Sequence, residues 1–331
     1  MPAPRPLGPD DPGRIGAYHL TGLLGRGGQG AVYLGTSPSG AEVAVKVLHP
    51  WMAEDGDARR RFLREADIAR RVAPFCTAHV LDSGLHGDRP YIVSEYVPGP
   101  SLEQVVRESG PRTGSGLERI AVTTASALAA IHRAGIVHRD LKPGNVILGP
   151  EGPVVIDFGI SRAGDHTVTR SGSIGTPGYM APEQIAGAAT GPPADVFGWA
   201  ATIAYAATGR RAFPGDTVPA VLHAILHREP DLTGVPAALA PLLARCLDKD
   251  PGLRPSAAEL YRSLTGEREP RPEPSPGPPG TPLEARTPPL PESPASPPTA
   301  PGGVSGAPAS PGQAGAPATA PSPGADAPAT S

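Results

Sequence analysis

The segment "HRDLKPGN", residues 138–145, brings a carboxylate at Asp140, an ammonium at Lys142 and an amide at Asn145 within six positions. One interpretation is an ordinary polar loop whose Asp and Asn cap turns. The other is the centre of a phosphoryl-transfer reaction. That chemistry also needs a phosphate cradle, a metal ligand and a place for the substrate, so the rest of the chain must decide between the two.

Composition divides the chain into three parts. Residues 266–331 hold 20 of the 46 prolines and no aromatic residue, and residues 1–13 have a similar composition. Such segments bury too little apolar surface to offset the entropy of ordering them. We therefore expect a disordered N-terminus at 1–13, a folded domain at 14–265 and a disordered Pro-rich tail at 266–331.

Charge, cysteine content and hydropathy exclude several classes of protein. The net charge of −3 lies entirely in the tail, and the remaining 26 acidic and 26 basic side chains balance, so no nucleic-acid partner is expected. Cys76 and Cys246 lack the spacing of metal ligands, which favours buried free thiols. No signal peptide opens the chain, and its most apolar stretch (196–209) is shorter than the ~20 residues of a membrane helix. We expect a soluble, cytoplasmic protein without a membrane segment.

Periodicity predicts a β-rich half followed by a helical half. Short β-branched runs between Tyr18 and Val47 alternate with Gly-rich turns, which predicts an antiparallel meander. A charged helix is expected at 55–72, followed by strands at 78–85 and 90–97. After these come helices at 101–108, 117–135, 194–208, 217–227, 236–247 and 256–263, two short strands at 145–148 and 153–158, and an irregular span at 159–182.

This order of elements predicts an α+β fold. A small β-rich lobe at about 14–97 precedes a larger helical lobe at about 98–265, with a cleft between the two lobes.

The segment "GRGGQG", residues 25–30, matches the pattern G-x-G-x-x-G. In a dinucleotide-binding unit such a motif opens a helix after a strand. Here "AVYLG" follows, which predicts a second strand, so Gly25, Gly27 and Gly30 are expected in a β-hairpin. Backbone without side chains can approach phosphates closely. A plain hairpin turn also needs glycine, so the motif does not decide the function by itself.

Lys46 lies in "VAVK" among apolar strand residues. A buried ammonium needs a partner, and Glu65 on the following helix is the candidate. The pair would leave Lys46 able to hold the α- and β-phosphates of a nucleotide. The alternative is a solvated lysine and an unrelated glutamate.

Asp157 in "VVIDFG" is the candidate metal ligand, together with Asn145. Mg²⁺ is typically held by one or two protein oxygens plus phosphates and water. Asp140 would remain for the incoming hydroxyl, and Lys142 for the charge of the γ-phosphate. "DFG" alone is also compatible with an aspartate that caps the end of a strand; its combination with "HRDLKPGN" favours the metal site.

The motifs, taken in order, resemble the signature set of protein kinases over residues 16–264. They are "GRGGQG" (25–30), "VAVK" (43–46), Glu65, "HRDLKPGN" (138–145), "DFG" (157–159), "GTPGYMAPE" (175–183), "DVFGWA" (195–200) and Arg254 in "RPS". Lysine two positions after Asp140 and the run "GTPGYMAPE" resemble Ser/Thr rather than Tyr kinases. The chain is most similar to bacterial eukaryotic-like (Hanks-type) serine/threonine kinases, and its Ala, Pro, Gly and Arg content suggests a high-GC actinobacterial source.

The resemblance implies roles for the site residues. Asp140 would orient the Ser or Thr hydroxyl and accept its proton, and Lys142 would neutralise the transferring phosphoryl group. Asn145 and Asp157 would hold two Mg²⁺ ions, for which Mn²⁺ can substitute. The ATP site would be formed by Leu24, Gly25, Gly27, Gly30, Val32, Ala44, Lys46, Glu95, Val97 and Ile147.

Further positions are implied to be structural or regulatory. Ser94 would be a small gatekeeper beside the adenine pocket, and Gln29 replaces the Met or aromatic residue common at the tip of the glycine loop. Structural roles are implied for His138, Phe158, Asp195 and the ion pair of Glu183 with Arg254.

Thr169 and Ser171 are the expected autophosphorylation sites, because a phosphate there could order the loop against Arg139 and Arg162. A flexible loop without regulation is the alternative. A homodimer would permit trans-autophosphorylation. Ser-Pro and Thr-Pro pairs in the tail could bind partners, although a passive linker is the favoured interpretation.

The sequence thus predicts an ATP- and Mg²⁺-dependent serine/threonine protein kinase with protein substrates. A pseudokinase scaffold is one alternative, but such proteins usually lack one of the positions equivalent to Lys46, Asp140 and Asp157. A small-molecule phosphotransferase of related fold is the other, but such enzymes lack "GTPGYMAPE" and the distant Arg254.

Overall fold

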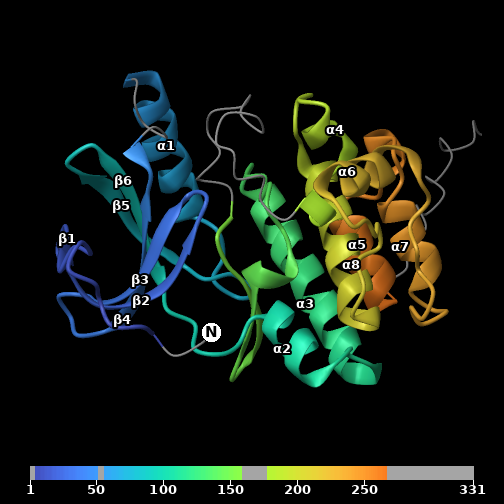
Figure 1. The fold of residues 1–331 in the computed structure, drawn as a ribbon, viewed down its shortest axis with the longest axis horizontal. Coiled ribbons are helices and arrows are strands. Elements are labelled where there is room, and N and C mark those ends of the chain that lie inside the picture. Colours follow the sequence, from blue (N-terminus) through green and yellow to red (C-terminus); the bar gives the residue numbers. More distant parts are fainter. Residues whose placement is uncertain (1–3, 51–55, 159–176, 267–331) are drawn as a thin grey trace, which may run out of the picture. The chain divides into compact units, whose positions relative to one another are not determined.

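The computed structural model describes residues 4–50, 56–158 and 177–266, which form two lobes (Figure 1). The N-terminal lobe is a six-stranded antiparallel sheet with strand order β1-β2-β3-β4-β6-β5. Its strands are β1 (Arg14–Ile15), β2 (Tyr18–Gly27), β3 (Gly30–Thr36), β4 (Glu42–Leu48), β5 (Val80–His86) and β6 (Arg89–Glu95). The predicted meander and the two later strands are confirmed.

Strand β4 shows why this sheet presents a cation to the cleft. Val43, Val45 and Val47 alternate along it and are buried in the core of the lobe. Because side chains alternate across a strand, Ala44 and Lys46 emerge on the opposite face. Both of them line the cleft, so the hydrophobic pattern of β4 fixes the direction in which Lys46 points.

Helix α1 (Gly56–Ala69) lies next to β5 and β6 (Figure 1). Its apolar side, with Phe62, Ala66 and Ala69, is buried, while the charged side chains lie toward solvent or are half-buried. Glu65 is half-buried on this helix.

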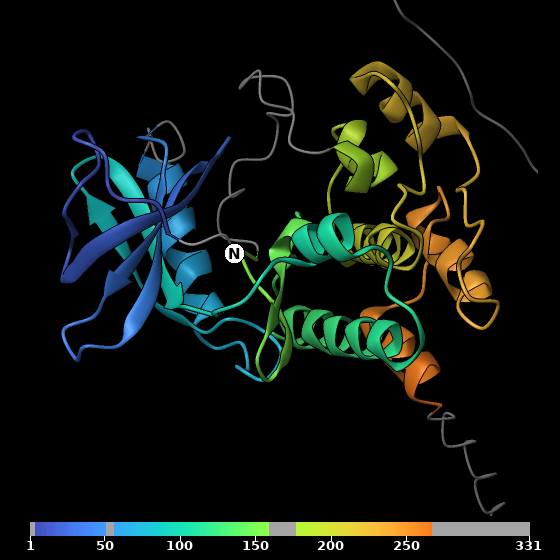
Figure 2. The same ribbon diagram turned by 60° about the horizontal axis from the view of Figure 1, so that its bottom comes forward.

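The C-terminal lobe is helical apart from a short hairpin of β7 (Val146–Gly149) and β8 (Gly152–Val155). Its helices are α2 (Leu102–Ser109), α3 (Gly114–Arg133), α4 (Pro182–Ile185), α5 (Pro192–Thr208), α6 (Val218–His227), α7 (Ala240–Cys246) and α8 (Ala257–Thr265), with short 3₁₀ turns at Pro143–Asn145, Pro177–Tyr179 and Pro251–Leu253. The α+β, two-lobed fold is therefore as predicted. In Figures 1 and 2, α3 and α8 lie side by side.

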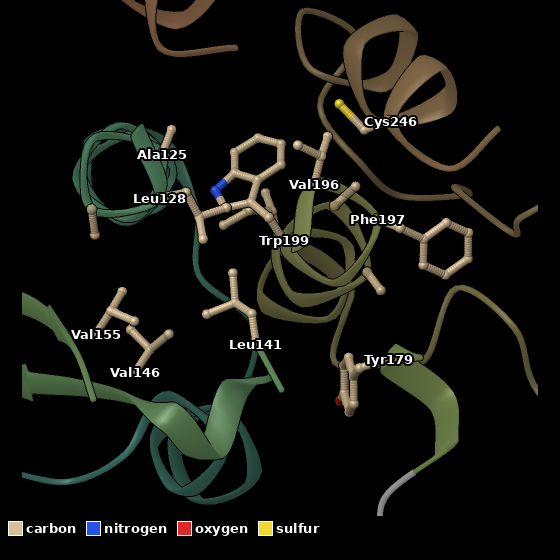
Figure 3. Packing of buried hydrophobic residues seen from close by; sticks show 14 of the residues in the cluster. Ala125, Leu128, Leu141, Val146, Val155, Tyr179, Val196, Phe197, Trp199 and Cys246 are labelled. Carbon is tan, nitrogen blue, oxygen red and sulfur yellow. The ribbon is translucent and has the colours of Figure 1, made fainter. Parts of the chain in front are cut away.

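Helix α5 forms the centre of the lobe's core, and most of its residues are buried. Figure 3 shows Trp199 directed from α5 toward Ala125 and Leu128 of α3. The indole Nε1 donates a hydrogen bond of 2.9 Å to Thr124 Oγ1, so the one polar atom of this buried ring is satisfied. Such a helix, hydrophobic on every side, is expected only inside a domain.

Helix α7 is shorter than the predicted 236–247. Residues 236–239 form a turn in which the amides of Leu239 and Ala240 both donate to Pro236 O. Pro241 has no N–H to continue that turn, and its ring would clash with the carbonyl of residue 237 in a continuous helix. The helix therefore begins anew at Ala240.

The prediction that residues 1–13 are disordered is wrong for the part that the structure describes. Arg5 forms an antiparallel bridge with Leu23 of β2, and Asp11 bonds side chains of β2 and β3. Composition gave no sign of these contacts, because they depend on the open edge of β2 and not on apolar residues of the segment itself. The tail, 267–331, is outside the described residues.

The prediction for the two cysteines is confirmed. Cys76 and Cys246 are free and buried. Within residues 4–50, 56–158 and 177–266, no helix combines the length and apolar character required to span a membrane.

Candidate active site

The loop that contains "HRDLKPGN" is held by the buried carboxylate of Asp195 on α5. The backbone amides of His138 and Arg139 donate to its two oxygens at 2.7 Å each, and His132 Nε2 lies 2.7 Å from Oδ2. Arg139 has a φ of 63°, which is strained for a residue with a side chain. The two short bonds to an ionised acceptor offset this strain and fix the loop's conformation.

His138 links this loop to the strand that precedes Asp157. The amide of Asp140 donates to its Nδ1 at 3.3 Å, so Nε2 carries the ring proton and donates to Ile156 O at 3.1 Å. Complete burial lowers the pKa of His138, which keeps the ring neutral and this tautomer in place. The structural role implied for His138 agrees with these contacts.

Asp140, Lys142 and Asn145 meet at one carboxylate oxygen. Lys142 Nζ lies 2.7 Å from Asp140 Oδ2, and Asn145 Nδ2 donates to the same oxygen at 3.2 Å and to Asp140 O at 2.8 Å. The side chains of Asp140 and Lys142 are 25% and 27% exposed, so both remain accessible from the cleft. Asn145 is buried, and its carbonyl oxygen is left for another partner.

Lys46 lies across the cleft from this group. Its Nζ is 3.3 Å from Asp157 Oδ2 and donates to Gln29 Oε1 at 2.9 Å. The two charged side chains are 12% and 32% exposed, respectively. Asp157 has a φ of 60°, a second strained position in the site. The pairing of Lys46 with Glu65 stays a prediction.

An apolar pocket extends from Lys46 and Asp157 along the inner face of the sheet. Its lining includes Val32, Ala44, Lys46, Glu95, Val97 and Ile147, which the resemblance assigns to an ATP site, together with Ser94, Tyr96, Ile156 and Asp157. Leu24, also predicted to form this pocket, is buried but is not among its lining residues. Its apolar walls suit a heterocyclic ligand, and Lys46 and Asp157 add charged groups to the lining.

A second, smaller pocket adjoins the first behind Ser94. It is lined by Lys46, Ala78, Val80, Ile92, Ser94, Asp157 and Phe158. Ser94 belongs to both pockets, and a larger residue at this position would narrow the passage between them. The position of Ser94 agrees with the gatekeeper role implied by the resemblance.

The glycines of the β2–β3 turn serve different purposes. Gly30 has a φ of 148°, and an added Cβ would lie 2.0 Å from Val47 O, so no other residue fits there. At Gly25 and Gly27 an added Cβ would meet nothing within 4 Å. The space beside these two glycines is open, which is what a backbone cradle for phosphates requires.

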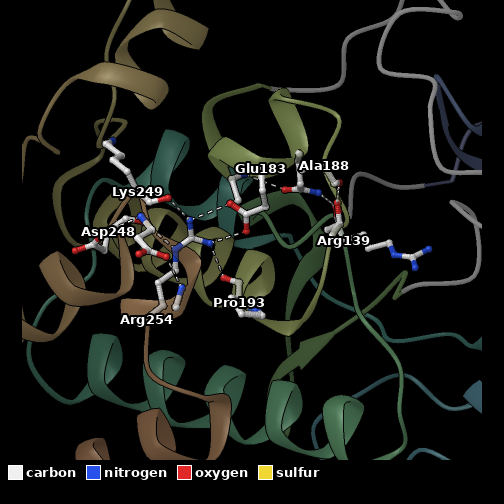
Figure 4. Close-up of polar contacts among 12 residues, drawn as sticks. Arg139, Glu183, Ala188, Pro193, Asp248, Lys249 and Arg254 are labelled. Atoms are coloured by element: carbon white, nitrogen blue, oxygen red, sulfur yellow. Dashed lines mark hydrogen bonds and ion pairs between the residues drawn. The ribbon is translucent and has the colours of Figure 1, made fainter. Parts of the chain in front are cut away.

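Outside the cleft, Arg254 and Glu183 form the predicted ion pair (Figure 4). Two guanidinium nitrogens of Arg254 contact the carboxylate at 2.7 and 3.0 Å, and its remaining hydrogen bonds go to the carbonyls of Pro193, Asp248 and Lys249. The Arg254 side chain is fully buried. A buried charge with this many partners ties α4 to the turn before α8.

The donor set of the site suits a metal that arrives with a ligand. Among residues 4–50, 56–158 and 177–266, no three His, Cys, Asp or Glu side chains converge as a metal site. Asn145 and Asp157 offer two oxygens, and Mg²⁺ needs octahedral coordination. These residues therefore fit Mg²⁺ only if phosphate oxygens and water complete the shell.

Two residues of the site were not predicted to act there. Gln29 contacts Lys46, and His132 shares Asp195 with the loop. The sequence holds no local signal for either contact, since each joins elements that only the fold brings together. Thr169, Ser171 and Arg162 lie outside the described residues.

Comparison with known proteins agrees with this geometry. Residues 18–264 match the protein kinase domain family. The chain is similar to the probable serine/threonine-protein kinase PkwA of Thermomonospora curvata, with 46% identity over 262 residues that cover 78% of this chain and 35% of PkwA. It is also similar to serine/threonine-protein kinase AfsK of Streptomyces coelicolor, with 42% identity over 258 residues, 77% of this chain and 32% of AfsK. The chain thus spans about a third of the length of these curated relatives.

A solved structure agrees with the fold. The kinase domain of PknI from Mycobacterium tuberculosis matches with a TM-score of 0.61 and 29% identity, over 77% of this chain and 97% of that domain. The resemblance to bacterial serine/threonine kinases, drawn above from motifs, is confirmed by the family match and the relatives.

Proposed function

This chain belongs to the protein kinase family, and from that premise we propose that it transfers the γ-phosphoryl group of ATP to Ser or Thr hydroxyls of proteins. One observation carries the proposal. Asp140, Lys142 and Asn145 share contacts within one loop, and the ion pair of Lys46 with Asp157 joins β4 to the segment that follows β8. A pseudokinase does not transfer phosphate, so it does not require all five of these side chains.

Asp140 has the environment of the group that orients the substrate hydroxyl and accepts its proton. Its Oδ2 is held by Lys142 and Asn145 at 2.7 and 3.2 Å, which fixes the direction of the carboxylate. The backbone of the loop is in turn held by Asp195. Positioning of this kind is a main source of catalysis where the protein does little covalent chemistry.

Lys142 and Lys46 supply the positive charge of the site. Lys142, beside Asp140, would neutralise the phosphoryl group as it moves toward the hydroxyl. Lys46 would bind the α- and β-phosphates, and Glu65 would orient it. In the structure Lys46 contacts Gln29 and Asp157, so nucleotide binding would have to rearrange at least the contact with Gln29.

Asn145 and Asp157 would hold Mg²⁺, or Mn²⁺ in its place, through their side-chain oxygens. Bound Mg²⁺–ATP would supply the transferable phosphoryl group and neutralise charge as it moves. Val32, Ala44 and Ile147 would enclose the adenine ring, with Leu24 at its margin, and the backbone of Glu95 and Val97 would bind its edge. The open space beside Gly25 and Gly27 supports a role of that backbone in phosphate binding.

Regulation by autophosphorylation is part of the proposal. Phosphates on Thr169 and Ser171 would add about −1.5 to −2 charge each and could dock against Arg139. A transient homodimer would allow one copy to phosphorylate the other. We further propose that the protein acts in the cytoplasm, where ATP is available, and that partners could dock on Ser-Pro and Thr-Pro pairs of the tail.

Labelled ATP and Mg²⁺ test the proposal when the wild-type protein is compared with Asp140→Asn. We expect label on protein for the wild type and a loss of at least ~10²-fold for the variant. Asp88→Asn, an equivalent change at an exposed turn residue, is the matched control and should behave as wild type. Equal labelling by all three proteins, or none by any of them, would reject protein kinase activity at this site.

A further inference from the structure

Residues 4–13 form an N-terminal strap along the outer edge of β2. The amide of Arg5 donates to Leu23 O at 3.0 Å, and the amide of Leu23 donates to Arg5 O at 2.8 Å. Farther along, Leu20 N donates to Gly13 O at 3.0 Å, and β1 continues the pairing at Arg14 and Ile15. The strap thus covers backbone groups that an edge strand would leave open.

Side chains of the strap also pack against the sheet. Pro4 lies so close to β2 that an added Cβ on Gly22 would be 2.9 Å from Pro4 Cβ. Leu7 packs against the core of the N-terminal lobe, which includes Tyr33 and Val45. Side-chain packing therefore holds the strap on the sheet in addition to the backbone hydrogen bonds.

Asp11 is the polar centre of the strap. Its Oδ1 accepts a hydrogen bond of 2.8 Å from Tyr33 Oη on β3 and forms an ion pair with Arg26 on β2, while Oδ2 accepts from the amide of Gly8 at 2.9 Å. The Asp11 side chain is only 3% exposed. One carboxylate thereby ties together both strands of the glycine-rich hairpin and the strap.

Asp11 contacts the hairpin on the face of the sheet opposite the nucleotide pocket. Tyr33 is buried in the core of the N-terminal lobe, whereas its neighbour Val32 lines the pocket. Arg26 pairs with Ala31 of β3. Ala31 lies two positions before Tyr33, so Arg26 and Tyr33 lie on the same face of the sheet. Asp11 can therefore restrain the hairpin without touching a bound nucleotide.

The ionisation of the three groups agrees with this arrangement. The Gly8 amide and the Tyr33 hydroxyl hold the pKa of Asp11 below its usual value, so the carboxylate stays charged. Burial, together with the bond to Asp11, raises the pKa of Tyr33 to about 12, so its hydroxyl stays a donor.

We propose that Asp11 is a positioning residue for ATP binding, which holds the glycine-rich hairpin over the nucleotide pocket through Arg26 and Tyr33. The inference rests on the proposed function, since it assigns the hairpin to phosphate binding. A tethered hairpin loses less conformational freedom when a nucleotide binds. Asp11 therefore acts on the affinity for ATP and not on the chemical step.

The test compares steady-state kinetics of the full chain with Asp11→Asn and with Asp10→Asn. Asp10 is the exposed neighbour of Asp11, and the same change there removes the same charge from the strap. We expect the KM for ATP to rise roughly five- to tenfold for Asp11→Asn, because a hydrogen bond and an ion pair to the hairpin are weakened. The kcat should stay within about twofold of the wild-type value. Asp10→Asn should leave both constants unchanged.

Three further measurements separate positioning from simple stabilisation. The milder variant Tyr33→Phe removes only one of the bonds and should raise the KM for ATP less than Asp11→Asn does. Combining Asp11→Asn with Arg26→Gln should cost little more than Asp11→Asn alone, because both changes break the same pair. Hydrogen exchange of the amides in residues 20–36 should become faster in Asp11→Asn and not in Asp10→Asn.

The possible outcomes are distinct. An active wild type with equal KM values for Asp11→Asn and Asp10→Asn would overturn the inference. So would a fall in kcat with no change in KM, or fully additive effects of the Asp11 and Arg26 changes. A wild-type protein that binds no nucleotide would instead reject the proposed function.

Discussion

Lys249 is a half-buried residue of the C-terminal lobe whose ammonium nitrogen lies against aromatic rings, and the charges of Glu229 and Asp248 favour its protonated form. Its Nζ lies 4.0 Å from the centroid of the Phe213 ring and 6.0 Å from that of Phe197. Within the described parts of the chain the ammonium is buried without a hydrogen-bond partner. Burial lowers the pKa of Lys249 to about 8, so its charge is less favourable in the folded protein than in water.

This lowered pKa predicts how stability depends on pH. Between about 8 and the usual value of 10.5, the unfolded chain binds a proton at Lys249 that the folded chain has lost. The unfolded state then holds more protons, so the free energy of unfolding rises with pH across this window. Denaturant unfolding at both ends of the window should show this rise in the wild type and a smaller one in Lys249→Met. Identical pH dependence in the two proteins would contradict the lowered pKa.

At the residue scale, the sequence predicted a set of side chains that the fold brings close together, and their catalytic roles stay a proposal. Lys46, Asp140, Lys142, Asn145 and Asp157 stand in motifs whose order along the chain restricts their possible arrangement, and the fold brings them to one cleft. Residues whose contribution is a single long-range contact were not predictable. Gln29 reaches Lys46 only because the hairpin bends over the sheet, and His132 reaches Asp195 only because α3 and α5 pack together.

At the element scale, the contact of α3 with α5 includes a fully buried polar bridge between Thr124 and Trp199. Thr124 Oγ1 donates to Ile120 O at 2.7 Å and accepts the bond from Trp199 Nε1. Both side chains are fully buried. A donor that loses its acceptor here has no access to water.

Thr124→Val should therefore lower the free energy of unfolding by about 1–3 kcal/mol, the cost of leaving the Trp199 N–H without an acceptor. Thr124→Ser keeps the hydroxyl and removes only a methyl group, so it should be the less destabilised of the two. Urea unfolding followed by tryptophan fluorescence measures both variants. Equal stabilities for Val and Ser would show that the hydrogen bond contributes nothing.

A second contact between elements is the ion pair of Glu183 on α4 with Arg254 in the turn before α8. Replacing Glu183 with Gln leaves the buried guanidinium without its counter-charge, and we expect a loss of about 3–5 kcal/mol in the free energy of unfolding. Adding Arg254→Met to this variant should recover part of the loss, because the uncompensated charge is removed with it. A double variant that is as unstable as the sum of both single changes would argue against this coupling.

Element boundaries show where sequence patterns reach their limit. Helices α3, α5 and α8 were predicted to within a few residues, because their apolar periodicity is long and their ends carry caps or glycine. Helix α7 was predicted too long, because the apolar pattern of 236–247 continues through Pro241 while the backbone hydrogen bonding does not. The apolar pattern indicates which side of a segment is buried, but it does not indicate whether each backbone N–H has a hydrogen-bond acceptor.

At the scale of the whole molecule, composition did not predict that the segment before β1 packs on the folded domain. Both flanking segments are rich in Pro and Gly, and both were expected to be disordered. The strap at 4–13 nevertheless packs on β2, because the edge of that strand offers unpaired backbone groups and Asp11 finds two partners. Composition measures only what a segment can bury by itself, so it underestimates a segment that completes another element's edge.

The C-terminal boundary rests on α8. Ser256 and Glu259 form a capping box at its start, and Gly266, with a φ of 73°, ends it in a left-handed conformation. Leu260 is fully buried, and the helix packs beside α3. These features place α8 in the domain core, and we propose that the folded domain ends near Thr265.

A chain truncated after Gly266 should therefore retain the wild-type free energy of unfolding and the wild-type rate of phosphorylation, since all contacts that cap and bury α8 among the described residues are kept. A chain truncated after Ser256 loses Leu260 and Ala257 from the core and should be destabilised by at least ~2–5 kcal/mol, the usual cost of emptying one large buried position. Denaturant unfolding of the two truncations beside the full chain distinguishes them. If the longer truncation lost stability or activity, residues 267–331 would have to contribute to the folded domain, and the boundary proposed at 265 would be wrong.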